Sequence, residues 1–340
     1  MKITEELIVN KALELGYENC GIIRIDDMSD FAEKLRERIE KAPGNDEFYG
    51  RYFRFANLRD ERPWAKSIVV CVINYGIYNL PEHLKGLIGR HYLADIRLDE
   101  NCKEHKASVA FEKYLQSLGL KVETDRRFGI TSMRWAAHKA GLGIIRRNNF
   151  FYTKNGSWVH IEGFLIDKEM ELIKTPQPEP CPQDCDLCIS ACPTKSLSEP
   201  YTMSPAACIS PITVREPDLV NNSYNRLMGE WIYGCDTCQD ICPHNAGKWL
   251  EIEDFPGLDA LGAALSLENI VNMDYERLAD MLSDKFFYIE KERICQWKVN
   301  ALNAMRNSYD EKYLGTIKAA TNDTNERVRG MAIRVLEQIS

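Results

Sequence analysis

The stretch Cys181-Pro-Gln-Asp-Cys185-Asp-Leu-Cys188-Ile-Ser-Ala-Cys192-Pro193 holds four closely spaced cysteines, the last followed by proline. A second run, Cys235-Asp-Thr-Cys238-Gln-Asp-Ile-Cys242-Pro243, has a similar pattern, and Cys208 lies between the runs. Gaps of two or three residues let a loop place successive thiolates around one iron–sulfur cube, and in two-cluster ferredoxins the cysteine before proline binds the other cluster. The pattern therefore predicts two 4Fe–4S clusters and a protein that transfers electrons.

The same rule assigns the motif cysteines to two groups of four. The expected ligands of the first cluster are Cys181, Cys185, Cys188 and Cys242. The expected ligands of the second cluster are Cys192, Cys208, Cys235 and Cys238. Paired Cys-x-x-Cys elements also bind zinc, but usually as separated pairs without a third close cysteine and a following proline. The spacing thus favours iron–sulfur clusters over zinc and over disulfides.

Composition and the first residues bear on where such clusters could be assembled. The chain opens Met-Lys-Ile-Thr-Glu-Glu without an apolar signal segment, and it contains no stretch of about 18 apolar residues. We expect a cytoplasmic protein without a membrane partner, in which thiols stay reduced. The cysteines outside the motifs are expected to be small buried apolar residues: Cys20, Cys71, Cys102 and Cys295. The net charge of −8 is not the usual footprint of a nucleic-acid binder, although local basic pairs occur at 126–127 and 146–147.

A length of 340 residues suggests two or three domains. Residues 1–175 alternate helical patterns with β-branched apolar runs, which predicts an α/β domain. Expected helices cover 1–20, 28–41 and 104–118, and expected strands cover 20–25, 68–73, 120–124 and 158–166. The continuous apolar run 68–73 is typical of a strand buried on both faces. The proline-rich segment 175–180 is expected to be a linker into a two-cluster ferredoxin-like domain at 176–250.

The remaining segment, 251–340, is predicted to be helical. Apolar residues recur at three- and four-residue spacing over 293–307 and 326–339, with a further helix at 312–320 and a turn at 321–325. Short helices joined in this way resemble HEAT-type units, which make binding surfaces. A plain helical cap on the cluster domain is an equally good interpretation.

The chain resembles the epoxyqueuosine reductase family in three features. These are the order of its domains, the segment Cys208-Ile-Ser-Pro-Ile-Thr213 and the run from Tyr233 to Asn245. The segments 140–143 (Ala-Gly-Leu-Gly) and 156–158 (Gly-Ser-Trp) are similar to the family's cobalamin-domain segments. The resemblance implies a base-off cobalamin packed between the α/β domain and one cluster. Electrons would pass from a low-potential donor of the ferredoxin or flavodoxin type through both clusters to cobalt. In the family, the reduced cobalt converts the epoxide of epoxyqueuosine in tRNA to the alkene of queuosine.

The resemblance also implies which residues would contact the cofactor. Glycines at 141 and 143 would let the backbone approach a flat macrocycle closely, and Trp158 could stack on it. The expected cobalamin contacts are Gly141, Leu142, Gly143, Arg146, Asn148, Ser157, Trp158 and His244.

The chain departs from the family pattern in the substrate half. The family's presumed proton donor is an aspartate in an Asp-x-Gly-Pro-x-x-Glu segment, and without gaps that aspartate falls at Arg127. We therefore expect a displaced catalytic proton donor, either Asp125 or Tyr92, because general acid chemistry tolerates another residue within reach. The family's Gly-Lys pair before asparagine is Arg146-Arg147 here, and its aromatic residue after the second Cys-Pro is His244.

Three functions follow from these matches and departures. The first is reduction of epoxyqueuosine, with tRNA bound by Arg146, Arg147 or the basic residues Arg327, Arg329 and Arg334. The second is a cobalamin and iron–sulfur reductase of another small substrate, as in reductive dehalogenases, with the extra arginines favouring an anion or a phosphate. The third is a non-catalytic module that passes low-potential electrons to a partner.

Overall fold

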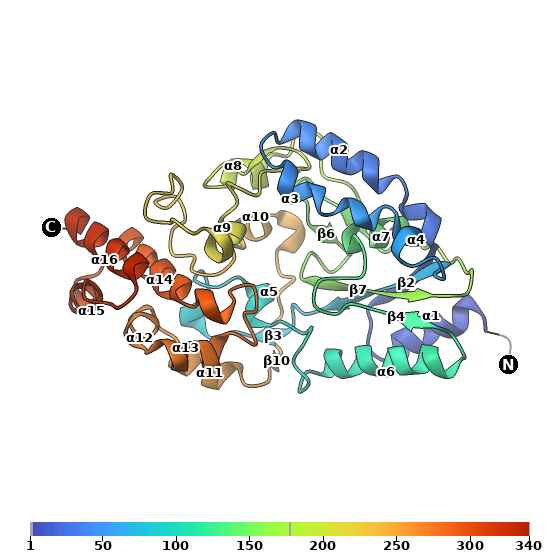
Figure 1. The fold of residues 1–340 in the computed structure, drawn as a ribbon. Helices are drawn as coiled ribbons and strands as arrows, with labels where there is room; N and C mark the ends of the chain where they lie inside the picture. The colour runs from blue at the N-terminus through green and yellow to red at the C-terminus, as the bar shows by residue number, and fades with distance from the viewer. Residues whose placement is uncertain (1–2, 177, 340) are drawn as a thin grey trace.

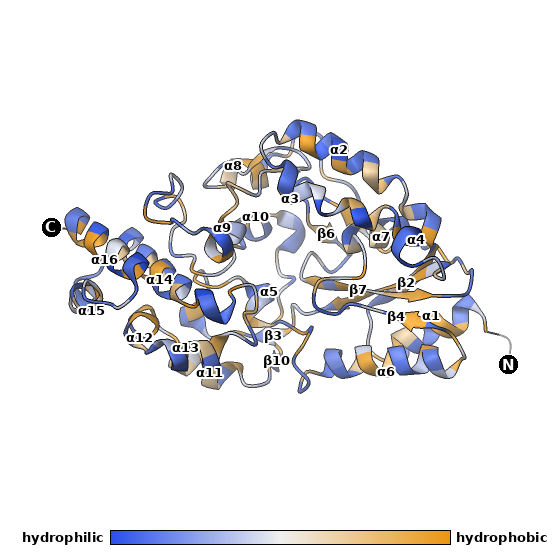
Figure 2. Cartoon of the chain, in the orientation of Figure 1, coloured by the Kyte–Doolittle hydropathy of each residue, from blue (hydrophilic) through white to orange (hydrophobic). Residues whose placement is uncertain are grey.

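The computed structural model describes residues 3–176 and 178–339 (Figure 1). Within this described part, an antiparallel four-stranded sheet runs in the order β1 (Asn19–Arg24), β2 (Ser67–Asn74), β7 (Val159–Ile166) and β4 (Val122–Glu123). These strands lie where the sequence predicts them, although β4 is shorter than expected. In Figure 2, β2 and β7 are among the most hydrophobic segments of the chain.

The central strand β2 is buried on both faces, as predicted. Its alternate residues Val69, Cys71 and Ile73 join the apolar cluster that includes α1 (Glu5–Glu14) and α6 (Lys103–Ser117). Ile68, Val70 and Val72 join a second cluster with α7 (Met133–Lys139). Because side chains alternate along a strand, one apolar run supplies both layers of core.

The helices of this domain fall in the predicted regions, but α1 is shorter than the predicted range 1–20, whose positions 1–2 lie outside the described residues. Helix α1 begins where the Thr4 hydroxyl accepts a hydrogen bond from the Leu7 amide at 3.3 Å, a typical N-cap. Helix α2 (Phe31–Lys41) falls within the second predicted helix, and α6 matches the third within one residue. The shorter elements are η1 (Ile25–Met28), α3 (Asp46–Gly50), η2 (Phe53–Phe55), α4 (Leu58–Glu61), β3 (Tyr78–Asn79), η3 (Glu82–Leu84), α5 (Arg90–Leu93), β5 (Ile144–Ile145) and β6 (Phe151–Tyr152).

The cysteine-bearing segment is built from short helices and turns. The described residues on either side of position 177 in the predicted linker have no helix or strand, and position 177 lies outside the described residues. The elements that follow are α8 (Leu187–Ala191), β8 (Leu197–Glu199), β9 (Thr202–Met203), α9 (Ile209–Arg215), α10 (Thr237–Asp240) and η4 (Pro243–Asn245). Helices α8 and α10, one from each cysteine run, pack against each other.

The C-terminal segment is helical, as predicted; a HEAT-type repeat stays a prediction. Its elements are β10 (Glu253–Asp254), α11 (Leu258–Ala264), α12 (Leu267–Asn272), α13 (Tyr275–Leu282), η5 (Lys291–Arg293), α14 (Cys295–Asn307), η6 (Glu311–Tyr313), α15 (Leu314–Ala320) and α16 (Glu326–Ile339). Every residue of α14 except the last is buried. The Asn300 side chain on this helix donates to the carbonyls of Thr213 and Ile232 at 2.7 and 2.8 Å, so α14 holds two loops of the cysteine segment.

The three predicted segments, 1–175, 176–250 and 251–340, share one core instead of packing separately. The apolar cluster that contains Ile8 of α1 continues to Val335 of α16. Strand β10 pairs in parallel with β3, and Tyr233 forms a bridge with Ile88. Among the described residues, no helix is long and apolar enough to cross a membrane.

Candidate iron–sulfur and cofactor site

Thiols from both cysteine runs lie near one another. Burial, together with the nearby thiols of Cys242, Cys181 and Cys185, raises the pKa of Cys188 to about 11. Burial also raises the pKa of Cys238, followed by repulsion from a group of thiols that comprises Cys235, Cys208, Cys192 and Cys188. Because Cys188 of the first cysteine run contributes to this repulsion, it lies near the thiols of Cys235 and Cys238 in the second run. Electrons could pass between clusters at these thiols without a mobile carrier.

The chemistry of these donors fits iron–sulfur clusters. Thiols that are buried together form thiolates only when a positive charge lies among them. Iron ions supply that charge. In the described ranges no three side chains of His, Cys, Asp or Glu lie close enough together to hold one metal ion. Assignment of individual ligands stays a prediction.

Two arginines from the β5–β6 hairpin hold the first cysteine run. The Arg147 guanidinium donates to the carbonyl oxygens of Cys185, at 2.8 Å, and of Gln183. Arg146 is 3% exposed, and its Nη1 donates to Sγ of Cys181 at 3.5 Å. The Arg146 guanidinium is therefore used inside the protein, whereas Arg147 is partly exposed. Binding of tRNA by these arginines and contact of Arg146 with cobalamin stay predictions.

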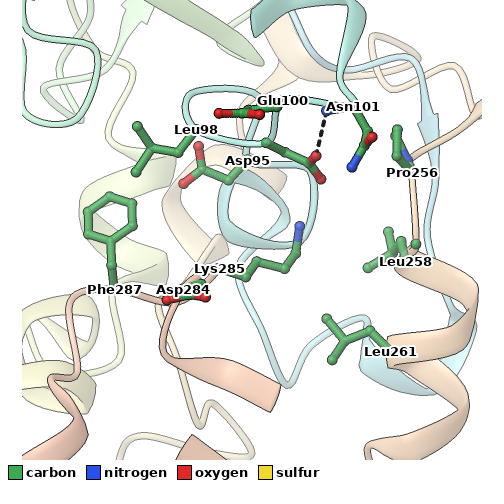
Figure 3. A pocket seen from close by; sticks show the side chains of 12 residues that line it. Asp95, Leu98, Glu100, Asn101, Pro256, Leu258, Leu261, Asp284, Lys285 and Phe287 are labelled. Carbon is green, nitrogen blue, oxygen red and sulfur yellow. Dashed lines mark hydrogen bonds between the residues drawn. The ribbon is translucent and has the colours of Figure 1, made fainter. Parts of the chain in front are cut away.

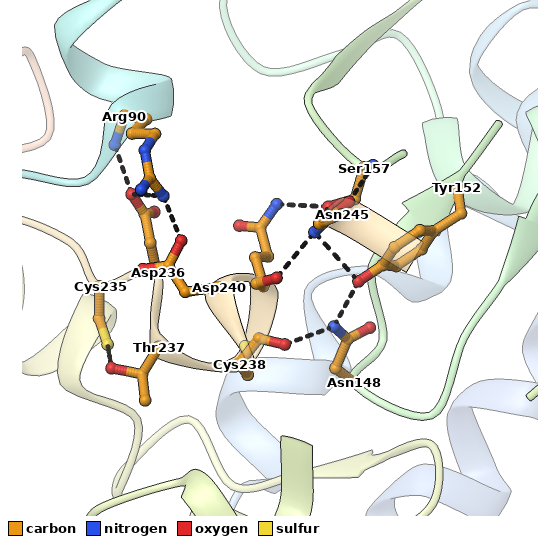
Figure 4. A network of polar contacts seen from close by, with 11 residues as sticks. Arg90, Asn148, Tyr152, Ser157, Cys235, Asp236, Thr237, Cys238, Asp240 and Asn245 are labelled. Carbon is orange, nitrogen blue, oxygen red and sulfur yellow. Dashed lines mark hydrogen bonds and ion pairs between the residues drawn. The ribbon is translucent and has the colours of Figure 1, made fainter. Parts of the chain in front are cut away.

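A buried amide network joins the cysteine segment to the α/β domain (Figure 4). Asn245 accepts the Ser157 amide at its Oδ1 at 2.8 Å, and its Nδ2 donates to Ser157 Oγ at 2.8 Å and to the Gln239 carbonyl at 2.9 Å. Asn148 Nδ2 donates to Tyr152 Oη at 2.9 Å and to the Cys238 carbonyl at 3.0 Å. The side chains of Asn148 and Ser157, which the sequence suggested as cobalamin contacts, thus bind protein groups. They fix the second cysteine run against β6.

The glycines at 141 and 143 are required by protein packing. Gly141 has φ +71°, and a Cβ there would lie 1.7 Å from the Lys174 carbonyl oxygen. A Cβ at Gly143 would lie 2.2 Å from the Tyr152 carbonyl oxygen. Protein packing thus already requires glycine at both positions, and the expected contact with a macrocycle stays a prediction.

Leu142 and Trp158 are buried as well. Leu142 lies in the core beneath α7, and Trp158 packs edge-on against Trp249 with ring centroids 5.3 Å apart. His244 is exposed on η4, and its pKa is lowered by partial burial and by the charge of Arg146. Of the expected cobalamin contacts, Leu142 and Trp158 are therefore packed in protein, whereas His244 is accessible.

Arg90 connects α5 to the second cysteine run, a contact that the sequence did not predict. Its backbone amide donates to Asp236 Oδ2 at 2.8 Å, and its guanidinium donates to the Asp240 carboxylate (Figure 4). The guanidinium also lies 4.9 Å from the Trp158 ring centroid. Burial raises the pKa of Asp236 to about 7 despite this neighbour. Two aspartates within the second cysteine run, Asp236 and Asp240, were the sequence feature that could have indicated a basic partner for this run.

Tyr92, one of the two expected proton donors, lies beside the second thiol group. Its ring meets Tyr233 edge-on at 4.8 Å, and its hydroxyl is 3.1 Å from Ser210 Oγ. Burial raises its pKa, and the neighbouring thiol of Cys208 adds to the increase. The phenol is therefore protonated at neutral pH, and it is a weaker acid than an ordinary tyrosine.

Two histidines near Tyr92 were not singled out from the sequence. The rings of His91 and His160 stack with centroids 6.5 Å apart. Burial first, and the positive charge of Arg97 second, lower the pKa of His91 to about 4 and that of His160 to about 3. Both rings keep part of their surface accessible, so they are neutral polar groups that a ligand could contact.

Asp125, the other expected donor, lies in a separate loop. Its Oδ1 accepts the backbone amides of Arg127 and Phe128 at 2.9 and 3.0 Å. The carboxylate thus stabilises its own turn, and within the described residues no hydrogen bond joins it to Tyr92. The Arg127 carbonyl accepts from Arg97 Nη1 at 2.8 Å, which ties this loop to the buried pair that Arg97 forms with Asp95.

A cavity of about 390 Å³ lies between the 95–101 loop, the start of α11 and residues 284–287 (Figure 3). Lys285 extends into it, and burial lowers the pKa of this lysine to about 8 against the opposing charges of Asp95 and Asp99. Its Nζ also lies 4.1 Å from the Phe255 ring centroid. Neither cysteine run contributes to the lining.

The C-terminal arginines divide into internal and surface groups. Arg327 donates to the carbonyl of Glu216, and Arg329 donates to two backbone carbonyls, so both hold the fold together. Arg334 is exposed. The pKa of Arg306 is lowered to about 10, first by burial and then by the charges of Arg226 and Arg334. These three cations therefore lie near one another.

Comparison with known proteins agrees with this geometry. A family model described as a 4Fe-4S double cluster binding domain matches residues 181–245. The fold and the site thus define an iron–sulfur protein with a two-cluster module. Curated relatives named epoxyqueuosine reductase include one from Leadbetterella byssophila, 30% identical over 256 residues that cover 69% of this chain and 78% of the relative. Another, from Prochlorococcus marinus, is 38% identical over 247 residues, which cover 70% and 77%.

The chain belongs to the epoxyqueuosine reductase family and is an oxidoreductase. Solved structures share the fold. An epoxyqueuosine reductase crystallised with a tRNA-Tyr stem loop modified with epoxyqueuosine has a TM-score of 0.77 at 22% identity, covering 98% of this chain and 89% of that one. The Bacillus subtilis epoxyqueuosine reductase, with its catalytic loop swung out of the active site, has the same TM-score and identity, covering 98% and 90%.

Proposed function

We propose that this protein reduces epoxyqueuosine in tRNA to queuosine, with electrons passing from a low-potential donor through two 4Fe–4S clusters to bound cobalamin. The observation that carries the proposal is the pair of adjacent thiol groups in a chain of this family. The reduction takes up two electrons and two protons. It breaks both C–O bonds of the epoxide, and the oxygen leaves as water.

Two arginines outside the expected cobalamin contacts suit the cofactor's phosphate. Arg38 and Arg134 both donate to Asn149, and burial and then the charge of Arg38 lower the pKa of Arg134 to about 10. Within the described residues neither arginine forms an ion pair. Cobalamin carries a phosphodiester, an anion that suits two cations without a carboxylate partner. When bound, cobalamin would supply the low-potential metal that reduces the epoxide.

The chain's own residues would supply the proton and orient the substrate. Tyr92 Oη is the donor that the geometry favours, because it lies beside the second thiol group. Its ring is held by Tyr233, so the hydroxyl is fixed near Ser210. Asp125 is less well placed because its carboxylate accepts two amides of its own loop.

The tRNA would be attracted by local charge, since the whole chain carries −8. Arg334 on α16 and Arg226 in the loop before α10 are exposed, lie near the buried Arg306 and form such a region. Phosphate contacts by arginine supply much of the affinity of RNA-binding proteins, and they weaken as salt rises.

Turnover of a stem loop that contains epoxyqueuosine tests the proposal, with the product identified by mass spectrometry. The reconstituted wild-type protein should form queuosine with a chemical reductant. Tyr92→Phe should lower the rate by about 100-fold or more at unchanged iron content, because a positioned acid contributes about that much. Asp125→Asn is the matched control and should keep most of the activity. A fully loaded wild-type protein that leaves the epoxide intact would refute the function, and an unimpaired Tyr92→Phe variant would refute the role of Tyr92.

A further inference from the structure

Arg146 is a buried cation without a carboxylate partner. It is 3% exposed, and its Nε is buried without a hydrogen-bond acceptor. Across the described residues no ion pair is formed by its guanidinium. The side-chain contacts that it makes are to Sγ of Cys181 at 3.5 Å and to the Tyr152 ring, whose centroid lies 5.1 Å away. A buried charge is costly unless an opposite charge accompanies it.

The local backbone fixes this side chain toward the cysteine run. The Arg146 amide donates to the Phe150 carbonyl at 2.9 Å, and the Asn149 amide donates to the Arg146 carbonyl at 2.8 Å. Asn149 adopts φ +65°, a left-handed conformation that asparagine tolerates better than most residues. The hairpin turn is therefore tightly specified, and it aims Arg146 at one thiol.

The missing negative charge would come from the cluster. A 4Fe–4S cube held by four thiolates is anionic, and its reduction adds one more negative charge. A cation in contact with one of those thiolates stabilises the reduced state more than the oxidised state. The effect is strong because buried charges are only weakly screened by salt.

We propose that Arg146 is the counter-charge of the cluster held by Cys181, Cys185, Cys188 and Cys242, and that it raises the reduction potential of that cluster above the value it would otherwise have. This inference rests on the proposed function, because it requires Cys181 to be a cluster ligand. Arg146 is a positioning and tuning residue: it touches a ligand of the electron carrier and does not touch the substrate.

The chain offers two matched comparisons. Arg147, the next residue, contacts the same loop through backbone carbonyls and not through sulfur. At the other thiol group, Thr237 Oγ1 lies 3.2 Å from Cys235 Sγ, which is a neutral contact to the second cluster. Arg147→Gln therefore controls for the removal of hydrogen bonds to the loop. Thr237→Val identifies which of the two measured reduction potentials belongs to the second cluster.

The experiment is a potentiometric titration of the loaded enzyme, followed by electron paramagnetic resonance, with iron measured in every sample. Arg146→Gln should shift one couple to a more negative potential, weakening reduction by at least tenfold, which is 59 mV for one electron. Thr237→Val should shift the other couple, Arg147→Gln should leave both close to wild type, and Arg146→Lys should fall between wild type and Arg146→Gln.

If Arg146→Gln does not retain iron, Arg146→His carries the same test. Its couple should fall as the pH rises from about 6 to about 9 and the imidazole loses its charge, beyond any change in the wild type. Unmoved potentials in a fully loaded Arg146→Gln, or in Arg146→His across that pH range, would overturn the role of Arg146 alone. A wild-type protein that assembles no pair of clusters would instead overturn the function on which the inference rests.

Discussion

Replacing Asn245 by alanine should uncouple the cysteine segment from the α/β domain. The side chain accepts the Ser157 amide and donates to Ser157 Oγ and the Gln239 carbonyl, all at 2.8 to 2.9 Å and buried (Figure 4). Leaving a buried amide without an acceptor costs about 1–3 kcal/mol. Each donor bond that is removed adds about 0.5–1.5 kcal/mol. We expect the free energy of unfolding to fall by about 3 kcal/mol.

The assay combines global and local measurements. Urea unfolding of the loaded protein gives the change in stability, and hydrogen exchange of the peptide that contains Ser157 reports whether its amide has become unprotected. Asn79→Ala is the matched control, because Asn79 makes its contact to Asp254 at the exposed surface and should cost less than about 0.5 kcal/mol. A loss below about 1 kcal/mol for Asn245→Ala, with the Ser157 amide still protected, would refute the reasoning.

The remaining predictions concern packing, pH and RNA affinity. Alanine at Gly141 should destabilise by about 1–3 kcal/mol more than alanine at Gly119 in urea unfolding, because both have positive φ but only Gly141 touches backbone where a Cβ would lie; equal losses would contradict this. Lys285→Met should be more stable than wild type by about 1–3 kcal/mol near pH 7, in thermal unfolding at several pH values. The pKa of Lys285 is about 8 in the folded protein and ordinarily 10.5. The loss of stability that the charged lysine causes in the wild type is therefore complete below pH 8, and it disappears as the pH rises to 10.5. A stability difference that does not vary with pH would contradict burial of the charge as its cause. Replacing Arg226 or Arg334 by glutamine should weaken binding of the tRNA stem loop. The slope of log K against log salt should fall by about 1 for each phosphate that the variant no longer binds. An unchanged slope would exclude these arginines as a tRNA-binding site.

The sequence predicted the sheet and the two-cluster module because both follow from short-range patterns. The apolar run of β2 specifies a strand with two buried faces. The cysteine spacing indicates a two-cluster module, and the matching family model covers residues 181–245. These signals do not depend on what other parts of the chain do.

The contacts that the sequence did not predict are long-range ones. At Gly141 and Gly143 the backbone of Lys174 and Tyr152 fills the space where a Cβ would lie. The side chains of Asn148 and Ser157 bind groups of the cysteine segment. A single sequence records that a residue is small or polar without recording what approaches it.

Charge was the least predictable property. Arg146 and Arg147 read as a basic surface pair, whereas both point into the cysteine loop. Arg306, which no motif contains, proved to be the centre of a three-arginine group. Whether a cation is solvated, paired or buried is set by the tertiary fold.

The metal content of the protein after anaerobic reconstitution with iron, sulfide and hydroxocobalamin is the most direct test of the proposed reduction. We expect about eight irons per chain in two 4Fe–4S clusters, together with one cobalt whose paramagnetic resonance is that of a base-off form. Eight irons without cobalt would contradict the cobalamin-dependent reduction and leave a protein that only transfers electrons. Zinc in place of iron would contradict the assignment of both cysteine runs, and with it the proposed function.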